Sequence, residues 1–178
     1  MKKPVSLAHA SRLINHGPTV LVSTFHAGLR NLMAAAWSMP VEFDPPRLAI
    51  VIDKSTLTRE HIVATDCLAL SVPGRSMADA TFAVGSISGR DLLNTSDKFT
   101  QFGLNSFLSP KLGLPWVEGA VAWLECRVIR EPHTEQAYDT FFVEVISAQA
   151  DERVFANGRW QMNEGNADLH TLHHLGAG

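Results

Sequence analysis

The sequence of 178 residues contains little that marks the large classes of membrane, secreted or nucleic-acid-binding proteins. No stretch of about 18 apolar residues occurs, so no membrane-spanning helix and no membrane partner are predicted. The opening Met-Lys-Lys runs into PVSLAHASR, which breaks before an apolar region can form and so does not predict a signal peptide. The two cysteines, Cys67 and Cys126, stand alone without Cys-x-x-Cys spacing, and a reduced, cytoplasmic protein is the simplest expectation.

Charged residues are nearly balanced, with 15 Lys and Arg against 18 Asp and Glu and a formal net charge of −3. No basic run is long enough to neutralise a phosphate backbone, so no nucleic-acid partner is expected. Three of the eight histidines, His170, His173 and His174, cluster in LHTLHHL. No Glu or third class of ligand stands at a recognisable spacing beside them, and no metal site is predicted.

Common motifs of nucleotide and acyl chemistry are also missing. The segment GSISG at residues 85–89 lacks the order of a Gly-x-Gly-x-x-Gly motif and is interpreted as a loop. Neither a P-loop nor a Gly-x-Ser-x-Gly elbow occurs, so NTPase and hydrolase chemistry have no local support.

The length favours a single domain over residues 1–178, since a chain of this size can bury roughly 70% of its unfolded surface around one core. Short strands with helices inserted mid-chain, and no regular βαβ alternation, predict a mainly β fold, a closed antiparallel barrel. Strands are expected at residues 18–25, 31–41, 47–53, 67–72, 120–130 and 140–150, with a polar loop at 131–139 between the last two. Helices are expected at residues 54–65, around Ala80 and around Phe99.

Residues 31–48 read NLMAAAWSMPVEFDPPRL, which combines three alanines and a tryptophan with a rigid Asp-Pro-Pro exit. One interpretation is packing, in which Ala34–Ala36 let a neighbouring element approach and Trp37 fills the core. The alternative is a flat aromatic cofactor that lies against backbone exposed by the small side chains, with hydrogen bonds from Asn31 and Ser38. A buried tricyclic ring contributes on the order of 4–6 kcal/mol at about 25 cal/mol per Å².

Residues 54–59, KSTLTR, lie where a strand is expected to end on Asp53 and a helix to begin. The segment supplies hydroxyls and positive charges through Ser55, Thr56, Thr58, Lys54 and Arg59. Free amides at a helix start, together with hydroxyls and cations, favour a phosphate site. The other interpretation, which spacing alone favours, is a capped surface helix with charged neighbours.

A series of short motifs runs through nearly the whole chain. Their order is Pro18-Thr-Val-Leu-Val, Asn31-x-Met33-x-Ala35-Ala36-Trp37, Asp44-Pro-Pro-x-Leu-Ala-Ile-Val-Ile, Thr58-Arg59, Ser71-Val-Pro, Asp97-Lys98-Phe99, Glu118-Gly119-Ala120-x-Ala122-x-Leu124-Glu125-Cys126 and His173-His174-Leu175-Gly176. In this order they resemble the flavin reductase-like FMN-binding split-barrel family.

The resemblance implies that FMN binds at a homodimer interface, with the alanine segment and the KSTLTR turn as two sides of one site. The residues implied to line the isoalloxazine and ribityl parts are Asn31, Met33, Ala35, Ala36, Trp37 and Ser38. The residues implied at the phosphate are Ser55 and Thr58, helped by Lys54 and Arg59 and preceded by Asp53. Lys98, in the matching Asp-Lys-Phe, is implied as a further flavin contact.

The implied activity is transfer of hydride or electrons from NADH or NADPH through FMN to a flavin or a partner protein. No catalytic side chain is assigned, because hydride transfer itself needs no acid or base from the protein. Many members of the family carry Gly-Asp-His where this chain has Tyr138-Asp139-Thr140, so an imidazole is missing there. The alternatives are a flavoredoxin-like electron carrier with tightly bound FMN, and a split-barrel protein that binds a ligand or assembles without a redox role.

Overall fold

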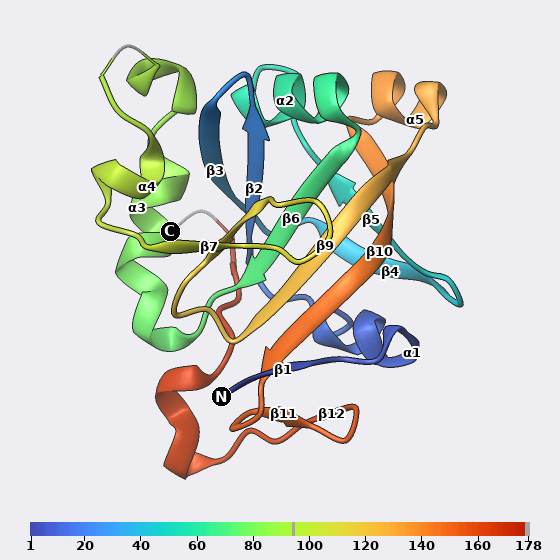
Figure 1. The fold of residues 1–178 in the computed structure, drawn as a ribbon, viewed down its shortest axis with the longest axis vertical. Coiled ribbons are helices and arrows are strands. Elements are labelled where there is room, and N and C mark those ends of the chain that lie inside the picture. Colours follow the sequence, from blue (N-terminus) through green and yellow to red (C-terminus); the bar gives the residue numbers. More distant parts are fainter. Residues whose placement is uncertain (94, 177–178) are drawn as a thin grey trace.

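The centre of the fold is an eight-stranded antiparallel sheet with the order β3-β2-β6-β9-β10-β5-β4, to which β1 adds by pairing with β10 (Figure 1). The computed structural model describes residues 1–93 and 95–176. The strands of the sheet are β1 (Lys2–Pro4), β2 (Val20–His26), β3 (Leu29–Ala35), β4 (Ser38–Phe43), β5 (Pro46–Val51), β6 (Cys67–Val72), β9 (Ala122–Ile129) and β10 (Thr140–Asp151). Two small hairpins pair β7 (Ser106–Leu108) with β8 (Pro115–Val117), and β11 (Phe155–Ala156) with β12 (Arg159–Trp160).

The helices lie between strands and at the ends of the sheet. The α-helices are α1 (Leu7–Ala10), α2 (Leu57–Thr65), α3 (Ala78–Ser86), α4 (Lys98–Gln101) and α5 (Pro132–Ala137). Four 3-10 helices complete the described elements: η1 (Ser11–Leu13), η2 (Arg75–Met77), η3 (Gly89–Leu92) and η4 (Glu164–Leu169). Figure 1 shows α2 and α5 at one end of the sheet, and α3 and α4 beside its β3 edge. Within the described residues, no helix has the length and apolar character needed to cross a bilayer.

Apolar side chains pack on both faces of the sheet. Val20 and Val22 of β2 belong to one buried cluster, whereas Leu21 between them belongs to a second cluster that contains Trp116 and Trp123. This alternation follows from the two-residue period of a strand, which sends successive side chains to opposite faces. The mainly β, antiparallel fold with inserted helices is therefore confirmed.

Closure of the barrel is not seen in the described residues. The sheet ends on β3 at one side and β4 at the other, and these two strands are consecutive in the chain. Each runs along a different neighbour, β3 along β2 and β4 along β5, so the short link between them does not reverse into a hairpin. The sheet is an antiparallel one with two edges, and a closed barrel stays a prediction.

Most predicted elements form within a few residues of their expected bounds, but two predictions are wrong. Residues 31–41 do not make one strand, because the seven residues of β2 pair only as far as Ala35 and the chain then crosses to β5. The turn that sets this register, Ala27-Gly28, has positive φ at both residues, as a tight hairpin of this kind requires. Residues 131–139 are not a plain loop either, since Pro132 starts α5 and the Glu135 carboxylate accepts a hydrogen bond from the Glu131 amide at 3.0 Å.

Candidate functional site

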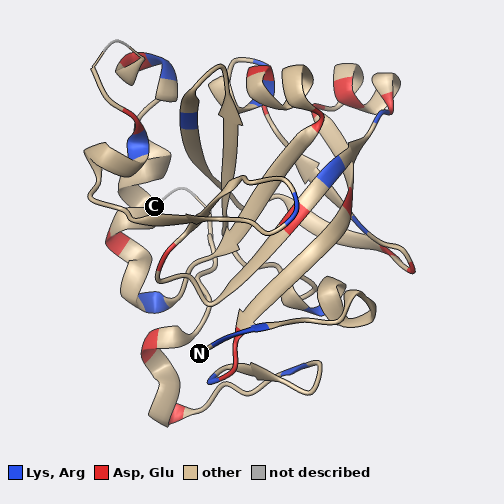
Figure 2. Cartoon of the chain, in the orientation of Figure 1, with Lys and Arg blue, Asp and Glu red and all other residues tan. Residues whose placement is uncertain are grey.

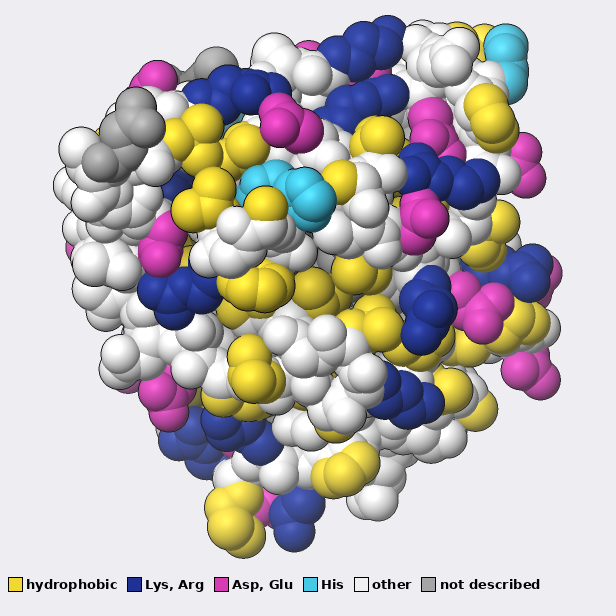
Figure 3. Space-filling model, turned by 45° about the horizontal axis from the view of Figure 1, so that its top comes forward, with side chains coloured by type: hydrophobic (Ala, Val, Ile, Leu, Met, Phe, Trp, Pro, Cys, Tyr) yellow, Lys and Arg dark blue, Asp and Glu magenta, His cyan; other side chains and the backbone are white. Residues whose placement is uncertain are grey.

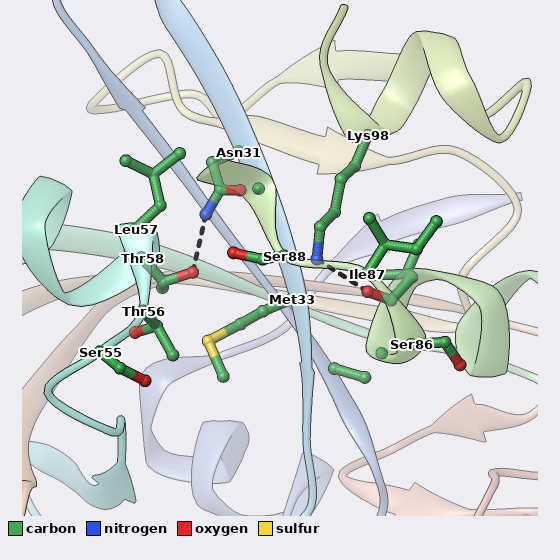
Figure 4. A pocket seen from close by; sticks show the side chains of 14 residues that line it. Asn31, Met33, Ser55, Thr56, Leu57, Thr58, Ser86, Ile87, Ser88 and Lys98 are labelled. Carbon is green, nitrogen blue, oxygen red and sulfur yellow. Dashed lines mark hydrogen bonds between the residues drawn. The ribbon is translucent and has the colours of Figure 1, made fainter. Parts of the chain in front are cut away.

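A small cavity of about 250 Å³ lies between β3, the start of α2 and the segment that joins α3 to η3 (Figure 4). Asn31 and Met33 reach it from β3, and Ser55 and Thr58 reach it from the α2 side. Lys98 of α4 points into it from across the cavity. The cavity therefore collects an amide, hydroxyls and one ammonium group from segments far apart in the sequence.

The start of α2 is fixed by its own side chains. Thr56 is the N-cap, and its hydroxyl accepts a hydrogen bond from the Arg59 amide at 3.2 Å. One oxygen of Asp53 accepts from the Ser55 amide at 2.8 Å and from the Ser55 hydroxyl at 2.6 Å. These bonds from Ser55 lower the pKa of Asp53. The turn is rigid, and the positive end of the nine-residue helix α2 faces the cavity.

Asn31 and Thr58 join β3 to α2 beside the cavity. The Asn31 side-chain amide donates to the Thr58 hydroxyl at 2.7 Å, and both residues are buried. A Cβ atom at Gly89 would lie 2.2 Å from the Asn31 side-chain oxygen, so only glycine fits there without moving the amide. The close approach of Gly89 therefore helps to hold one wall of the cavity in place.

Lys98 is the main charge at the cavity. It is 4% exposed, and its ammonium group donates to the carbonyl oxygen of Val84 at 2.8 Å. Among the described residues, no carboxylate lies within ion-pair distance of it. Burial lowers the pKa of Lys98, and the nearby Asp91 opposes that shift. A buried cation without a paired anion favours a negatively charged ligand.

A second, larger cavity of about 720 Å³ adjoins the first, and the two share Ala34, Gly85 and Ser86. Its walls come from the end of β3, from α3 and from the segment that includes His173 and His174. Small residues form much of its floor, while two exposed aromatic side chains, Trp37 and Phe82, stand at its rim. The two cavities together offer a polar, positively charged compartment beside a wider apolar one.

A family profile described as "Flavin reductase like domain" matches residues 12–164. The chain belongs to this flavin reductase-like family. The resemblance seen in the sequence motifs is confirmed.

Three comparisons illustrate how the chain relates to other members. The protein YddH of Escherichia coli K12 is 53% identical over 178 residues, which cover 98% of this chain and 91% of that protein. A crystal structure of an FMN-binding domain of a flavin reductase-like enzyme from Shewanella baltica OS155 has a TM-score of 0.94 at 42% identity, covering 99% of this chain and 91% of that one. The flavoredoxin of Desulfovibrio vulgaris (Miyazaki F) has a TM-score of 0.70 at 25% identity, covering 81% and 75%.

The structure brings together many of the residues that the sequence predicts for the flavin site. Asn31, Met33, Ser55, Thr58 and Lys98 line the small cavity, and Ala35, Ala36 and Trp37 line the large one. The idea that Trp37 fills the core is wrong, since its side chain is 74% exposed. Because the two cavities adjoin, the alanine segment of this flavin reductase-like chain lies next to its KSTLTR turn.

Four predicted residues lie outside both cavities. The Arg59 guanidinium points away, bonding the carboxylate of Asp139 at 3.1 Å and backbone oxygens of Ile52 and Glu135. Lys54 also pairs with Asp139, at 3.4 Å. Asp53 is occupied by Ser55, and the Ser38 hydroxyl is buried without a partner among the described residues. Both cations expected at the phosphate, Lys54 and Arg59, are thus committed to Asp139.

Residues 85–89 form a part of the cavity wall that was not predicted from the sequence. The prediction of a loop for GSISG is wrong in part, since Gly85 and Ser86 end α3 and Gly89 starts η3, and all five residues line the small cavity. Just beyond it, Arg90 donates to the Ser55 carbonyl at 3.1 Å and pairs with Glu60 at 3.0 Å. The composition of GSISG was the feature that could have indicated this wall, since glycines and serines let the backbone approach a ligand closely.

Proposed function

We propose that the protein binds FMN, with the phosphate in the small cavity and the ring toward the large one, and acts as an NAD(P)H-dependent flavin reductase-like oxidoreductase. The observation that carries the proposal is the buried Lys98 ammonium, which lies across the small cavity from the start of α2 and makes a single hydrogen bond within the described residues. It retains two N–H groups for an anion. FMN is also the cofactor named for the Shewanella baltica domain.

The residues of the small cavity fit a phosphate group. A dianionic phosphate would compensate the Lys98 charge and lie near the positive end of the α2 dipole. The hydroxyls of Thr58 and Ser88 are at hand as further donors, whereas the Ser55 hydroxyl gives its proton to Asp53. Arg59 and Lys54, by contrast, act on the phosphate only indirectly, by holding the α2 start against Asp139.

The large cavity fits a flat ring. Its volume of about 720 Å³ lies within the range of sites for small molecules and exceeds the small cavity. The side chains of Ala34–Ala36 are short enough to let a planar group lie close to the β3 backbone. Trp37 and Phe82 line this cavity and are exposed, so both are available to cover one face of a bound ring.

When bound, FMN supplies the hydride and electron chemistry of the reaction. The chain orients the ring through the short β3 side chains, neutralises the phosphate through Lys98 and excludes water through the aromatic rim. The donor is NADH or NADPH and the acceptor a flavin or a partner protein. No side chain is assigned as an acid or base.

A second candidate is a flavoredoxin-like electron carrier that keeps its FMN and does not oxidise NAD(P)H directly. The missing imidazole favours it, since Thr140 stands where many members carry the histidine, and the preceding Asp139 is occupied by Arg59 and Lys54. The likeness to the Desulfovibrio vulgaris flavoredoxin agrees with this candidate.

Spectroscopy and turnover separate the candidates. The purified protein should show a flavin absorption spectrum, or acquire one on addition of FMN, and should oxidise NADH or NADPH when FMN or FAD is supplied. Tightly bound FMN with negligible pyridine-nucleotide oxidation would favour the electron carrier. A colourless protein whose spectrum ignores added FMN would contradict both and favour a non-redox split-barrel protein.

The homodimer is proposed from exposed apolar side chains on the edge strand β4 and just before it. Trp37, Met39, Val41 and Phe43 are 74%, 59%, 45% and 78% exposed, and a β-bulge between Pro40 and Glu42 interrupts the alternation of the strand. Figure 3 shows hydrophobic side chains gathered across the middle of one face, with charged residues around them. An exposed apolar edge of this kind favours association.

Light scattering tests the dimer. The wild-type protein should have about twice the chain mass of 19.5 kDa, and Met39→Glu with Phe43→Glu should give monomers. Leu108→Glu, at an exposed leucine of β7, is the control and should stay dimeric. A monomeric wild type would contradict the proposal.

We further propose a single cytoplasmic domain over residues 1–178 with no nucleic-acid partner. Figure 2 supports the last point, since positive and negative residues are interspersed over the chain rather than gathered by sign.

A further inference from the structure

Three segments that are distant in the sequence meet at the side chain of His16. Its Nε2 atom lies 2.9 Å from the Thr171 hydroxyl, and that hydroxyl lies 3.2 Å from Nε2 of His173. The Nδ1 atom of His173 lies 3.1 Å from the carbonyl oxygen of Gly17. The ring of Trp160 packs against His16 with its centroid 5.1 Å away. The three polar side chains form an unbranched chain that begins and ends near residues 16–17.

The direction of every hydrogen bond in this chain follows from the Gly17 carbonyl, which can only accept. Nδ1 of His173 must therefore donate, and in that Nδ1–H tautomer the Nε2 atom accepts. The Thr171 hydroxyl gives its one proton to that Nε2, so it must accept from Nε2–H of His16. The two histidines consequently hold opposite tautomers, Nε2–H in His16 and Nδ1–H in His173.

This arrangement leaves the Nδ1 atom of His16 as a buried acceptor without a partner among the described residues. A buried unsatisfied group is unfavourable and calls for an explanation. Burial, and then the nearby His173, lower the pKa of His16 to about 4, so the ring is neutral near pH 7. An apolar side chain would pack on Trp160 without an orphaned atom, so the histidine is explained by the bond it donates to Thr171.

Backbone hydrogen bonds hold the Thr171 segment independently of these side chains. The Thr19 amide donates to the Leu172 carbonyl at 2.8 Å, and the Arg75 amide donates to the His170 carbonyl at 2.8 Å. Thr171 also forms a β-bridge with Gly74. The backbone of this segment is therefore attached without the side-chain hydrogen bonds, and these bonds orient the His173 ring. That ring lines the large cavity.

We propose that His16 is a positioning residue for the large cavity: through the Thr171 hydroxyl it fixes the His173 ring in the wall against which the second reactant binds. The identity of that reactant, NADH or NADPH, rests on the proposed function. Asp79 of α3 and His174 are the other titratable groups on this wall. Neither takes part in the chain of hydrogen bonds.

Tautomers test the geometry without any cofactor chemistry. Long-range ¹H–¹⁵N correlation spectra of the full chain at pH 8 should show His16 as the Nε2–H tautomer and His173 as the Nδ1–H tautomer. Thr171→Val, which removes the shared hydroxyl at nearly constant volume, should leave His16 with a mixed tautomer signal, while the Gly17 carbonyl keeps His173 in the Nδ1–H tautomer. Averaged signals in the wild type, or an Nδ1–H tautomer of His16, would overturn the proposal.

Kinetics test the positioning. Thr171→Val should raise the KM for NADH or NADPH about tenfold, as expected for loss of one hydrogen bond, with FMN affinity within about twofold of wild type. Thr171→Ser keeps the hydroxyl and should behave as the wild type. A wild-type KM in Thr171→Val, or the same defect in Thr171→Ser, would overturn the proposal. If the wild type oxidises neither nucleotide, the proposed reaction fails and the tautomers alone decide this inference.

Discussion

The buried ammonium group of Lys98 donates to the carbonyl oxygen of Val84 across 2.8 Å, and it lies across the small cavity from the start of α2. A lysine in this position is unfavourable in the empty protein, because its charge loses hydration without gaining a paired anion. Its placement makes sense when an anion completes the cavity.

Replacing Lys98 should separate ligand binding from stability. Lys98→Met keeps most of the volume and removes the charge, so FMN affinity should fall about 10- to 100-fold, as for loss of a charge-assisted hydrogen bond. The cofactor-free variant should melt no lower than the wild type, because a desolvated charge has been removed. Fluorescence titration with FMN and thermal melts of the cofactor-free protein measure the two effects. A large fall in melting temperature with unchanged FMN affinity would show that Lys98 is structural.

Arg59 should show the opposite pattern. Its guanidinium is mostly buried against Asp139 and two backbone carbonyls, so Arg59→Gln should lower the free energy of unfolding by about 1–3 kcal/mol. FMN affinity should change less than in Lys98→Met, since Arg59 lines neither cavity. Urea denaturation and the same fluorescence titration make the comparison. An FMN defect as large as that of Lys98→Met would restore Arg59 as a direct phosphate ligand.

Ala36 tests whether the alanine segment is a ligand surface or packing. Ala36→Leu places a branched side chain in the large cavity and should weaken FMN binding about tenfold or more. The melting temperature of the cofactor-free protein should change little, because the residue is partly exposed. Ala137→Leu, at an exposed alanine of α5, is the control for adding a leucine. Equal losses of FMN affinity and of stability in Ala36→Leu would show that the alanine segment only packs against its neighbours.

Acid should destabilise the protein partly through His16. Its pKa is lowered from 6.5 to about 4 by burial and by His173, so between these values the unfolded chain binds a proton that the folded chain does not. The resulting stability is fully present above pH 6.5 and is lost as the pH falls toward 4, with up to about 2 kcal/mol gone at pH 5. Denaturation at pH 7.5 and pH 5 should show a smaller difference for His16→Phe than for the wild type. Because burial also lowers the pKa of His61, some difference should persist in the variant. Identical pH dependence would contradict the assignment.

The sequence predicted those parts of the fold that depend on local patterns. β6 forms at Cys67–Val72 as expected, because its apolar run is bounded by turn residues. The end of β3 was not predictable, since Ala36-Trp37 leaves β2 for the opposite edge of the sheet through pairing with β5 that no local pattern encodes. The short strands β7, β8, β11 and β12 likewise depend on tertiary packing rather than on their own periodicity.

For the site, hydroxyls and alanines were found because they follow one another in the chain. The partners that redirect Lys54 and Arg59 were not, because Asp139 lies 80 residues from Arg59 and meets it only in the folded protein. The same applies to the chain from His16 to Thr171, which spans 155 residues. Long-range electrostatic partners are set by topology, and a single sequence does not reveal them.

Thr58 and Arg59 are neighbours on α2 that fasten the helix on two sides, one to Asn31 of β3 and the other to Asp139 before β10. A binding site held on two sides in this way loses little conformational entropy when a ligand binds, and it keeps its shape when the ligand dissociates. The same site therefore suits both a ligand that stays bound and a ligand that exchanges rapidly. The few groups that contact the ligand, above all Lys98, determine which of the two occurs.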